Sequence, residues 1–149
     1  MSLSTPRPPA LDRLNVFIGR WLTEGATVAT PTAPSVRILA SDIYEWAPGG
    51  EFIVHPVYSR IGERDFGGLE VIAYDPSTNQ FRTHFFDRTG RAITETLTFR
   101  DDSWIWQGDH HRCTGTISED GRTITARHEV SDDGLRWSPS MTVTLQKVE

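Results

Sequence analysis

Residues that can exchange protons fall on predicted strands, at positions that alternation turns toward the interior of the protein. Glu95 lies on the apolar face of segment 92–100, opposite a face of threonines. His128 shares its face with aliphatic residues in segment 123–131. A carboxylate and an imidazole enclosed by apolar side chains can act as general acid and base, or can hold the hydroxyl or amine of a ligand. The two residues therefore indicate either acid–base catalysis or small-molecule binding.

A third candidate, His84, depends on the turn that joins its strand to the strand of Glu95. If the turn centred on Thr89-Gly90 contains an even number of residues, His84 stands directly opposite Glu95. Directly opposed residues share a face of the sheet, so this register predicts a His84–Glu95 pair inside the protein.

The same reasoning applies to the turn at Asp120-Gly121. An even turn there pairs Ile117 with Ile124 and Cys113 with His128. A Cys–His nucleophile pair is conceivable, but the sequence offers no orienting group or oxyanion hole beside it. We interpret Cys113 as a small buried hydrophobic residue.

Further candidates are aromatic or basic residues on predicted strands. Some of the aromatic side chains must line the interior, and Arg82, with Arg88 and Arg91, can attract an anionic group at one rim. His55 lies just before Pro56, and alternation does not settle which face of its strand is buried. The predicted ligand-binding set is Glu95, His84, His128, Trp46, Trp106, Tyr44, Arg82 and His55.

The histidines also raise the question of a metal site. Glu95, His84 and His128 have the residue types of a two-His-one-carboxylate centre, but they come from separate strands without diagnostic spacing. His110 and His111 are adjacent on a strand and point to opposite faces. We therefore expect no metal site.

The elements that position these residues are predicted to be strands. Turn signals recur from Pro31 to Gly134, and the segments between them are rich in β-branched and aromatic residues, which predicts about ten strands. A short helix is expected over 10–18, where Leu11, Leu14 and Ile18 recur at helical spacing. The pattern is typical of an all-β fold, a single antiparallel β-barrel with the helix capping one end. We expect a flexible N-terminal arm over 1–9 and one barrel domain over 10–149.

Composition excludes several classes of protein. The chain has 149 residues, a formal net charge of -5 and a single cysteine. The acidic balance argues against nucleic-acid binding, and one cysteine excludes an internal disulfide. There is neither an apolar run long enough to span a membrane nor the apolar stretch of a secretory signal, so we expect a cytoplasmic protein.

Several motifs resemble those of calycin-type barrels, and of one uncharacterised bacterial family among them, domain of unknown function 1579. They are the Gly-x-Trp entry at Gly19-Arg20-Trp21, Tyr44-Glu45-Trp46, Gly49-Gly50-Glu51-Phe52-Ile53, Tyr74-Asp75-Pro76, Phe86-Asp87 and Gly115-Thr116-Ile117-Ser118. The resemblance implies a ten-stranded barrel similar to lipocalins and fatty-acid-binding proteins. In nitrobindin, a related haem-binding barrel, the iron-ligating histidine lies on the last strand. The last predicted strand here, 141–146, has no histidine, so we expect no haem or other cofactor.

Taken together, the sequence predicts a binding barrel for a small apolar or amphipathic molecule that carries one polar or anionic group. One alternative is a cofactor-independent acid–base enzyme of isomerase, cyclase or hydratase type that uses Glu95 with His84 or His128. Another is a non-catalytic interaction protein with a filled barrel and an exposed apolar patch. We expect neither a nucleic-acid nor a membrane partner, and a homodimer is compatible with each hypothesis.

Overall fold

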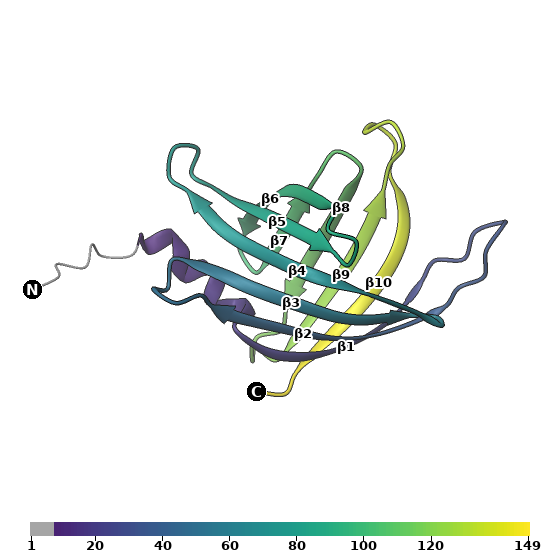
Figure 1. The fold of residues 1–149 in the computed structure, drawn as a ribbon, viewed down its shortest axis with the longest axis horizontal. Coiled ribbons are helices and arrows are strands. Elements are labelled where there is room, and N and C mark those ends of the chain that lie inside the picture. The colour runs from purple at the N-terminus through teal and green to yellow at the C-terminus, as the bar shows by residue number, and fades with distance from the viewer. Residues whose placement is uncertain (1–7) are drawn as a thin grey trace, which may run out of the picture.

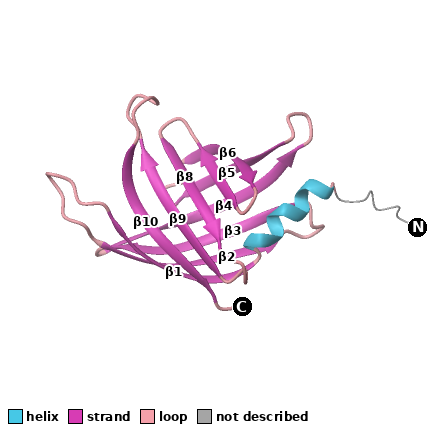
Figure 2. Cartoon of the chain, turned by 180° about the vertical axis from the view of Figure 1, so that it is seen from behind, coloured by secondary structure: helices cyan, strands magenta, loops and turns pink. Residues whose placement is uncertain are grey.

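The computed structural model describes residues 8–149, which form one short helix and ten strands (Figures 1 and 2). The elements are η1 (Pro9–Phe17), β1 (Gly19–Thr27), β2 (Arg37–Trp46), β3 (Phe52–Ile61), β4 (Arg64–Asp75), β5 (Gln80–Asp87), β6 (Ala92–Arg100), β7 (Ser103–Gln107), β8 (His111–Ile117), β9 (Thr123–Val130) and β10 (Ser138–Lys147). The predicted all-β class and strand number are confirmed.

The strands form a closed antiparallel barrel in which each strand pairs with its neighbours in sequence. The ring is completed by β1 and β10, in a register that includes Trp21 opposite Lys147 and Thr27 opposite Met141. Closure leaves no unpaired sheet edge, which is the physical reason that a long meander of short strands favours a barrel.

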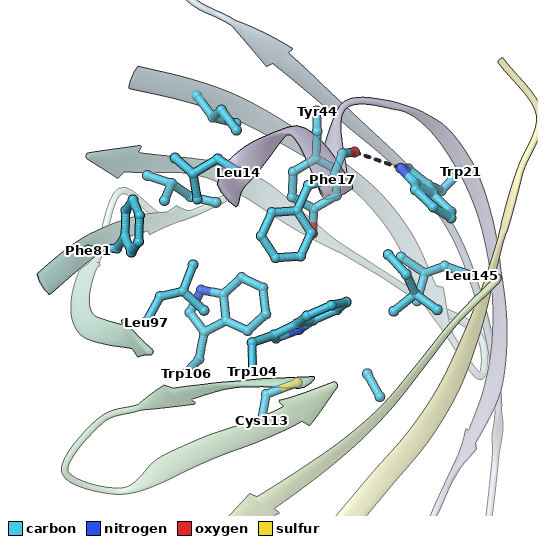
Figure 3. Packing of buried hydrophobic residues seen from close by; sticks show 14 of the residues in the cluster. Leu14, Phe17, Trp21, Tyr44, Phe81, Leu97, Trp104, Trp106, Cys113 and Leu145 are labelled. Atoms are coloured by element: carbon cyan, nitrogen blue, oxygen red, sulfur yellow. Dashed lines mark hydrogen bonds between the residues drawn. The ribbon is translucent and has the colours of Figure 1, made fainter. Parts of the chain in front are cut away.

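One end of the barrel is closed by the helix, which is a 3-10 helix that begins at Pro9. Leu11, Leu14 and Phe17 are almost completely buried, and Figure 3 shows Phe17 packed over the interior aromatic side chains. The indole N–H of Trp21 donates to the carbonyl of Phe17 over 2.8 Å, so the first strand fixes the end of the helix. Of the arm predicted over 1–9, residues 1–7 lie outside the described part of the chain.

The opposite end of the barrel carries the loops after β1, β3, β5, β7 and β9. Three apolar residues that alternate toward the inner wall are substantially exposed there: Phe66 (47%), Ile93 (41%) and Val130 (45%). We call these residues the apolar rim. Their exposure shows that the inner wall meets solvent at this open end.

The register of the β5–β6 hairpin corrects one prediction. Phe86 pairs with Ala92 and Thr83 pairs with Glu95, so five residues separate the last paired positions rather than an even number. His84 therefore stands opposite Thr94 on the outer face, and the predicted His84–Glu95 pair is wrong. The extra residue is accommodated by Asp87, whose carboxylate accepts hydrogen bonds from two backbone N–H groups of the turn.

The β8–β9 hairpin has the predicted register. Cys113 pairs with His128, and Ile117 pairs with Ile124. Both pairs lie on the inner wall, since Cys113 and Ile124 are buried. In residues 8–149 no helix is long and apolar enough to cross a membrane.

Candidate functional site

The inner wall of the barrel holds two networks of ionisable side chains. The first is centred on His55 of β3, between Asp42 of β2 and Glu70 of β4. His55 Nδ1 lies 2.9 Å from Glu70 Oε1, and His55 Nε2 lies 2.7 Å from Asp42 Oδ1. The Thr23 hydroxyl donates to the other Asp42 oxygen. All four residues are buried, and each reaches the inner wall by strand alternation.

Two flanking carboxylates make His55 a cation at neutral pH. Burial by itself lowers the pKa of His55, but hydrogen bonds to Asp42 and Glu70 and the charges of these carboxylates outweigh it. Together they raise the pKa from 6.5 to about 9. The Tyr44 ring stacks on the imidazolium with 3.7 Å between ring centroids, an arrangement in which a π face meets a positive charge.

The second network joins Glu95, His111, His128 and Cys113 from three strands. Glu95 Oε2 lies 2.8 Å from His111 Nδ1, and His111 Nε2 lies 2.9 Å from His128 Nδ1. His128 Nε2 lies 3.5 Å from Cys113 Sγ. The His111 side chain is 35% exposed and that of Glu95 is 11% exposed, so the chain of contacts runs from the open end to a buried thiol.

The protonation of this chain follows from its geometry. Burial, together with the neighbouring His111, lowers the pKa of His128 to about 4, so His128 is neutral at pH 7. A carboxylate only accepts hydrogen bonds, so His111 Nδ1 donates to Glu95. If His111 is also neutral, His128 Nδ1 donates to it and the Cys113 thiol donates to His128 Nε2. Donors and acceptors then alternate along the network from Cys113 to Glu95.

The two networks share one electrostatic environment. Burial, followed by the charges of Glu70 and Glu95, raises the pKa of Cys113 to about 12. Burial, followed by Asp42, Glu70 and Cys113, raises the pKa of Tyr44 well above its usual value. The thiol therefore stays protonated at neutral pH, and Cys113 is not an activated nucleophile.

Aromatic side chains separate these networks from the helix end of the barrel. Phe17 contacts Trp104 and Trp106 with ring centroids 4.9 and 5.4 Å apart (Figure 3). Trp104 lies against the inner wall only because residue 115 is glycine, since a Cβ there would stand 2.3 Å from the indole nitrogen. The Trp106 N–H is buried and has no acceptor within residues 8–149. A buried donor of this kind costs about 1–3 kcal/mol when unpaired and suits a water or ligand oxygen.

The structure brings most of the predicted site residues together on the inner wall. Glu95, His128 and His55 belong to the two networks, and Tyr44 and Trp106 adjoin them. Trp46, also a predicted residue, is half-buried at the closed end, where its indole N–H donates to Asn15 Oδ1 over 3.0 Å.

Two predicted residues lie on the outer wall instead. His84 contacts the hydroxyl of exposed Thr94, with 3.3 Å between Nδ1 and Oγ1. Arg82 pairs with Asp75 over 3.4 Å. The β5–β6 register differs by one residue from the predicted one, and this explains both, because a shift of one residue turns every side chain of β5 to the opposite face.

Sequence reasoning missed Asp42, Glu70 and His111. His111 was predictable, because it lies two residues before Cys113 and alternation gives the two residues the same face. Asp42 stands in the same relation to Tyr44. Glu70 lies in a strand with apolar residues on both faces, so its orientation had no signal in the pattern.

Within residues 8–149, no group of three or more His, Cys, Asp or Glu residues is arranged to hold a metal ion. A groove of about 410 Å³ lies on the outer wall and is lined in part by Leu22, Leu39 and Tyr58. A second pocket, of about 450 Å³, lies between the helix and the β4–β5 end.

Three solved structures share this fold at low sequence identity. Rv2717c from M. tuberculosis has a TM-score of 0.69 and 14% identity, with 97% of this chain and 100% of that chain covered. A protein of unknown function from the DUF3598 family of Nostoc punctiforme has a TM-score of 0.62 and 13% identity, covering 97% of this chain and 51% of that one. The phycobiliprotein lyase CPES from Guillardia theta has a TM-score of 0.57 and 8% identity, covering 93% and 92%.

These likenesses establish the barrel fold. No curated protein matches this chain. A family model described as a protein of unknown function, DUF1579, matches residues 9–133, and the chain belongs to that family.

Proposed function

We propose that the protein binds a largely apolar small molecule inside the open end of its barrel. The observation that carries this proposal is the position of the second network, Glu95, His111 and His128, beneath the apolar rim. Glu95 lies two residues inward from Ile93, and His128 lies two residues inward from Val130. An entering molecule would meet apolar side chains first and ionisable groups about 7 Å further along each strand. Burial of ligand carbon supplies affinity, and the polar groups fix its orientation.

The closed end of the barrel supports the same proposal. The helix and the buried aromatic rings fill that end, so the open end is the route to the two networks. The unpaired Trp106 N–H offers a bound molecule one hydrogen bond that the protein itself does not satisfy.

The direct test is binding of an uncharged apolar fluorophore, N-phenyl-1-naphthylamine, to the wild-type protein. We expect saturable fluorescence enhancement that weakens at least about tenfold in Val130→Arg, because an arginine at the rim places a charge beside the ligand. The matched control is Leu135→Arg, an 84% exposed apolar residue in the β9–β10 loop, which should bind as the wild type does.

Other outcomes of this experiment would overturn the proposal. A lack of binding would contradict it, as would equal weakening in both variants. Loss of binding in Leu39→Arg instead would assign the apolar contact to the groove on the outer wall and favour an interaction protein. Native mass spectrometry of freshly purified protein, beside a denatured sample, would show whether a ligand is retained through purification.

A second candidate function is cofactor-independent acid–base catalysis, favoured specifically by the hydrogen-bonded second network. Glu95 and His111 at the open end would exchange a proton with a substrate, and the hydrogen bond from His128 would hold the His111 ring in place. The test is turnover of a bound ligand once one is identified. His128→Gln should then lower kcat more than it raises KM, whereas His84→Gln on the outer wall should change neither.

A further inference from the structure

The interior of the barrel carries more negative than positive charge. Asp42, Glu70 and Glu95 contribute three carboxylates, all on side chains only 11% exposed. His55 supplies one positive charge, and His128 is neutral at pH 7 because burial lowers its pKa to about 4. Even with a proton on His111, one negative charge stays uncompensated.

Basic side chains elsewhere in the described residues do not correct this imbalance. The arginine ion pairs in residues 8–149 join other acids, and no lysine or arginine pairs with Asp42, Glu70 or Glu95. Arg64 and Lys147 alternate toward the inner wall, but they lie at the ends of β4 and β10. Lys147 is at the closed end, with its Nζ 5.7 Å from the centre of the Trp21 ring.

An uncompensated charge in a poorly solvated interior is unfavourable, and a ligand of opposite charge relieves it. An anionic head group, one of the possibilities that the sequence left open, would instead meet three carboxylates. Counted from the open end, Glu95 is the fourth residue of β6, whereas Asp42 is the sixth of β2 and Glu70 the seventh of β4. Glu95 is therefore the first of these carboxylates that an entering head group reaches.

We propose that the natural ligand is an amphipathic amine, whose ammonium group binds at Glu95 while its hydrocarbon part lies against Phe66, Ile93 and Val130. This inference rests on the proposed function and adds the charge of the ligand to it. An ammonium group has three hydrogen-bond donors and no acceptor, so it needs only acceptors around it. The Glu95 carboxylate is such an acceptor: His111 occupies its Oε2 atom, and its other oxygen can accept from the ammonium group. The aromatic faces of the interior favour the same charge.

The test compares three probes of equal chain length at pH 7 by isothermal titration calorimetry: octylamine, octanol and octanoate. We expect octylamine to bind at least about tenfold more tightly than octanol, because a charge-assisted hydrogen bond to Glu95 is stronger than a neutral one. Octanoate should bind more weakly than both, because its carboxylate meets the carboxylates of the interior. In Glu95→Gln the advantage of octylamine over octanol should fall by about tenfold or more, while octanol affinity is unchanged.

The matched control is Glu45→Gln, which makes the same substitution at an exposed, outward-facing position of β2 and should leave all three affinities unaltered. Tighter binding of octanoate than of octylamine would overturn the inference, as would equal binding of the three probes; either result would leave the proposed function intact. If no probe binds, the proposed function fails and the inference fails with it. The wild-type comparison does not depend on the folding of any variant.

Discussion

The His55 network predicts a specific loss of stability at alkaline pH. The pKa of His55 is about 9 in the folded protein, against 6.5 as its ordinary value in an unfolded chain. Between these two values the folded state holds a proton that the unfolded state releases. The stabilisation is therefore fully present below pH 6.5 and is lost as the pH rises through 9.

The size of the stability loss follows from the difference between the folded and unfolded pKa values of His55. A displacement of about 2.5 pH units at 1.36 kcal/mol per unit corresponds to about 3 kcal/mol of unfolding free energy. Most of this is present at pH 6, and less than about 1 kcal/mol of it is left at pH 9. Because the side chain is buried between two carboxylates, little of this interaction is screened by solvent.

Urea denaturation at pH values from 6 to 9, with folding monitored by tryptophan fluorescence, measures the predicted loss. Asp42→Asn should reduce its size, because it removes one of the two charges that hold the proton on His55. The outward-facing control Glu45→Gln should retain the full loss. A flat profile in the wild-type protein, or an equal profile in Asp42→Asn, would refute the assignment of His55 as a buried cation.

Three further predictions concern residues around the second network. His128 has its pKa lowered to about 4 by burial and by His111, so between pH 6.5 and 4 the unfolded chain binds a proton that the folded protein does not. About 3 kcal/mol of unfolding free energy should therefore be lost as the pH falls through this range; urea denaturation extended down to pH 4 measures this loss, which should be smaller in His128→Gln. Cys113 has its pKa raised to about 12 by burial, so its thiol should react slowly with iodoacetamide. At pH 8 we expect labelling at least about 100-fold slower in the folded protein than in urea. Labelling at equal rates would contradict the burial of Cys113. Gly115→Ala should lower the unfolding free energy by about 1–3 kcal/mol, because the added Cβ clashes with Trp104. Adding Trp104→Phe to this variant should restore part of the lost stability. A Gly115→Ala variant as stable as the wild type would show that Trp104 is not closely packed against residue 115.

The fold could be predicted because its signals are local. Alternation identified the inner faces of the strands that carry Glu95 and His128, and the even number of residues in the turn around Asp120-Gly121 fixed the pairing of Cys113 with His128. The apolar spacing of Leu11 and Leu14 located the helix, which packs into one end as expected.

The site could be predicted only in part, because it depends on relations between strands. The β5–β6 turn has an odd number of residues, and this single residue moved His84 and Arg82 to the outer wall. The partner of Glu95 is His111, which lies 16 residues away on a strand that does not pair with β6. Contacts across the interior of a barrel follow from its curvature, which the alternation of one strand does not encode.

The five histidines of the chain allow one measurement to test the central claim, which is that a ligand binds against the inner wall beneath the apolar rim. His55, His111 and His128 lie in the interior networks, whereas His84 and His110 contact Thr94 and the Ser131 carbonyl outside them. Titration of the ¹⁵N-labelled protein with N-phenyl-1-naphthylamine, followed through the imidazole nitrogen resonances, distinguishes the two groups. The account predicts shifts at His111 and His128 with His84 and His110 unchanged. Saturable binding that shifts His84 or His110 and leaves the interior histidines unchanged would contradict it.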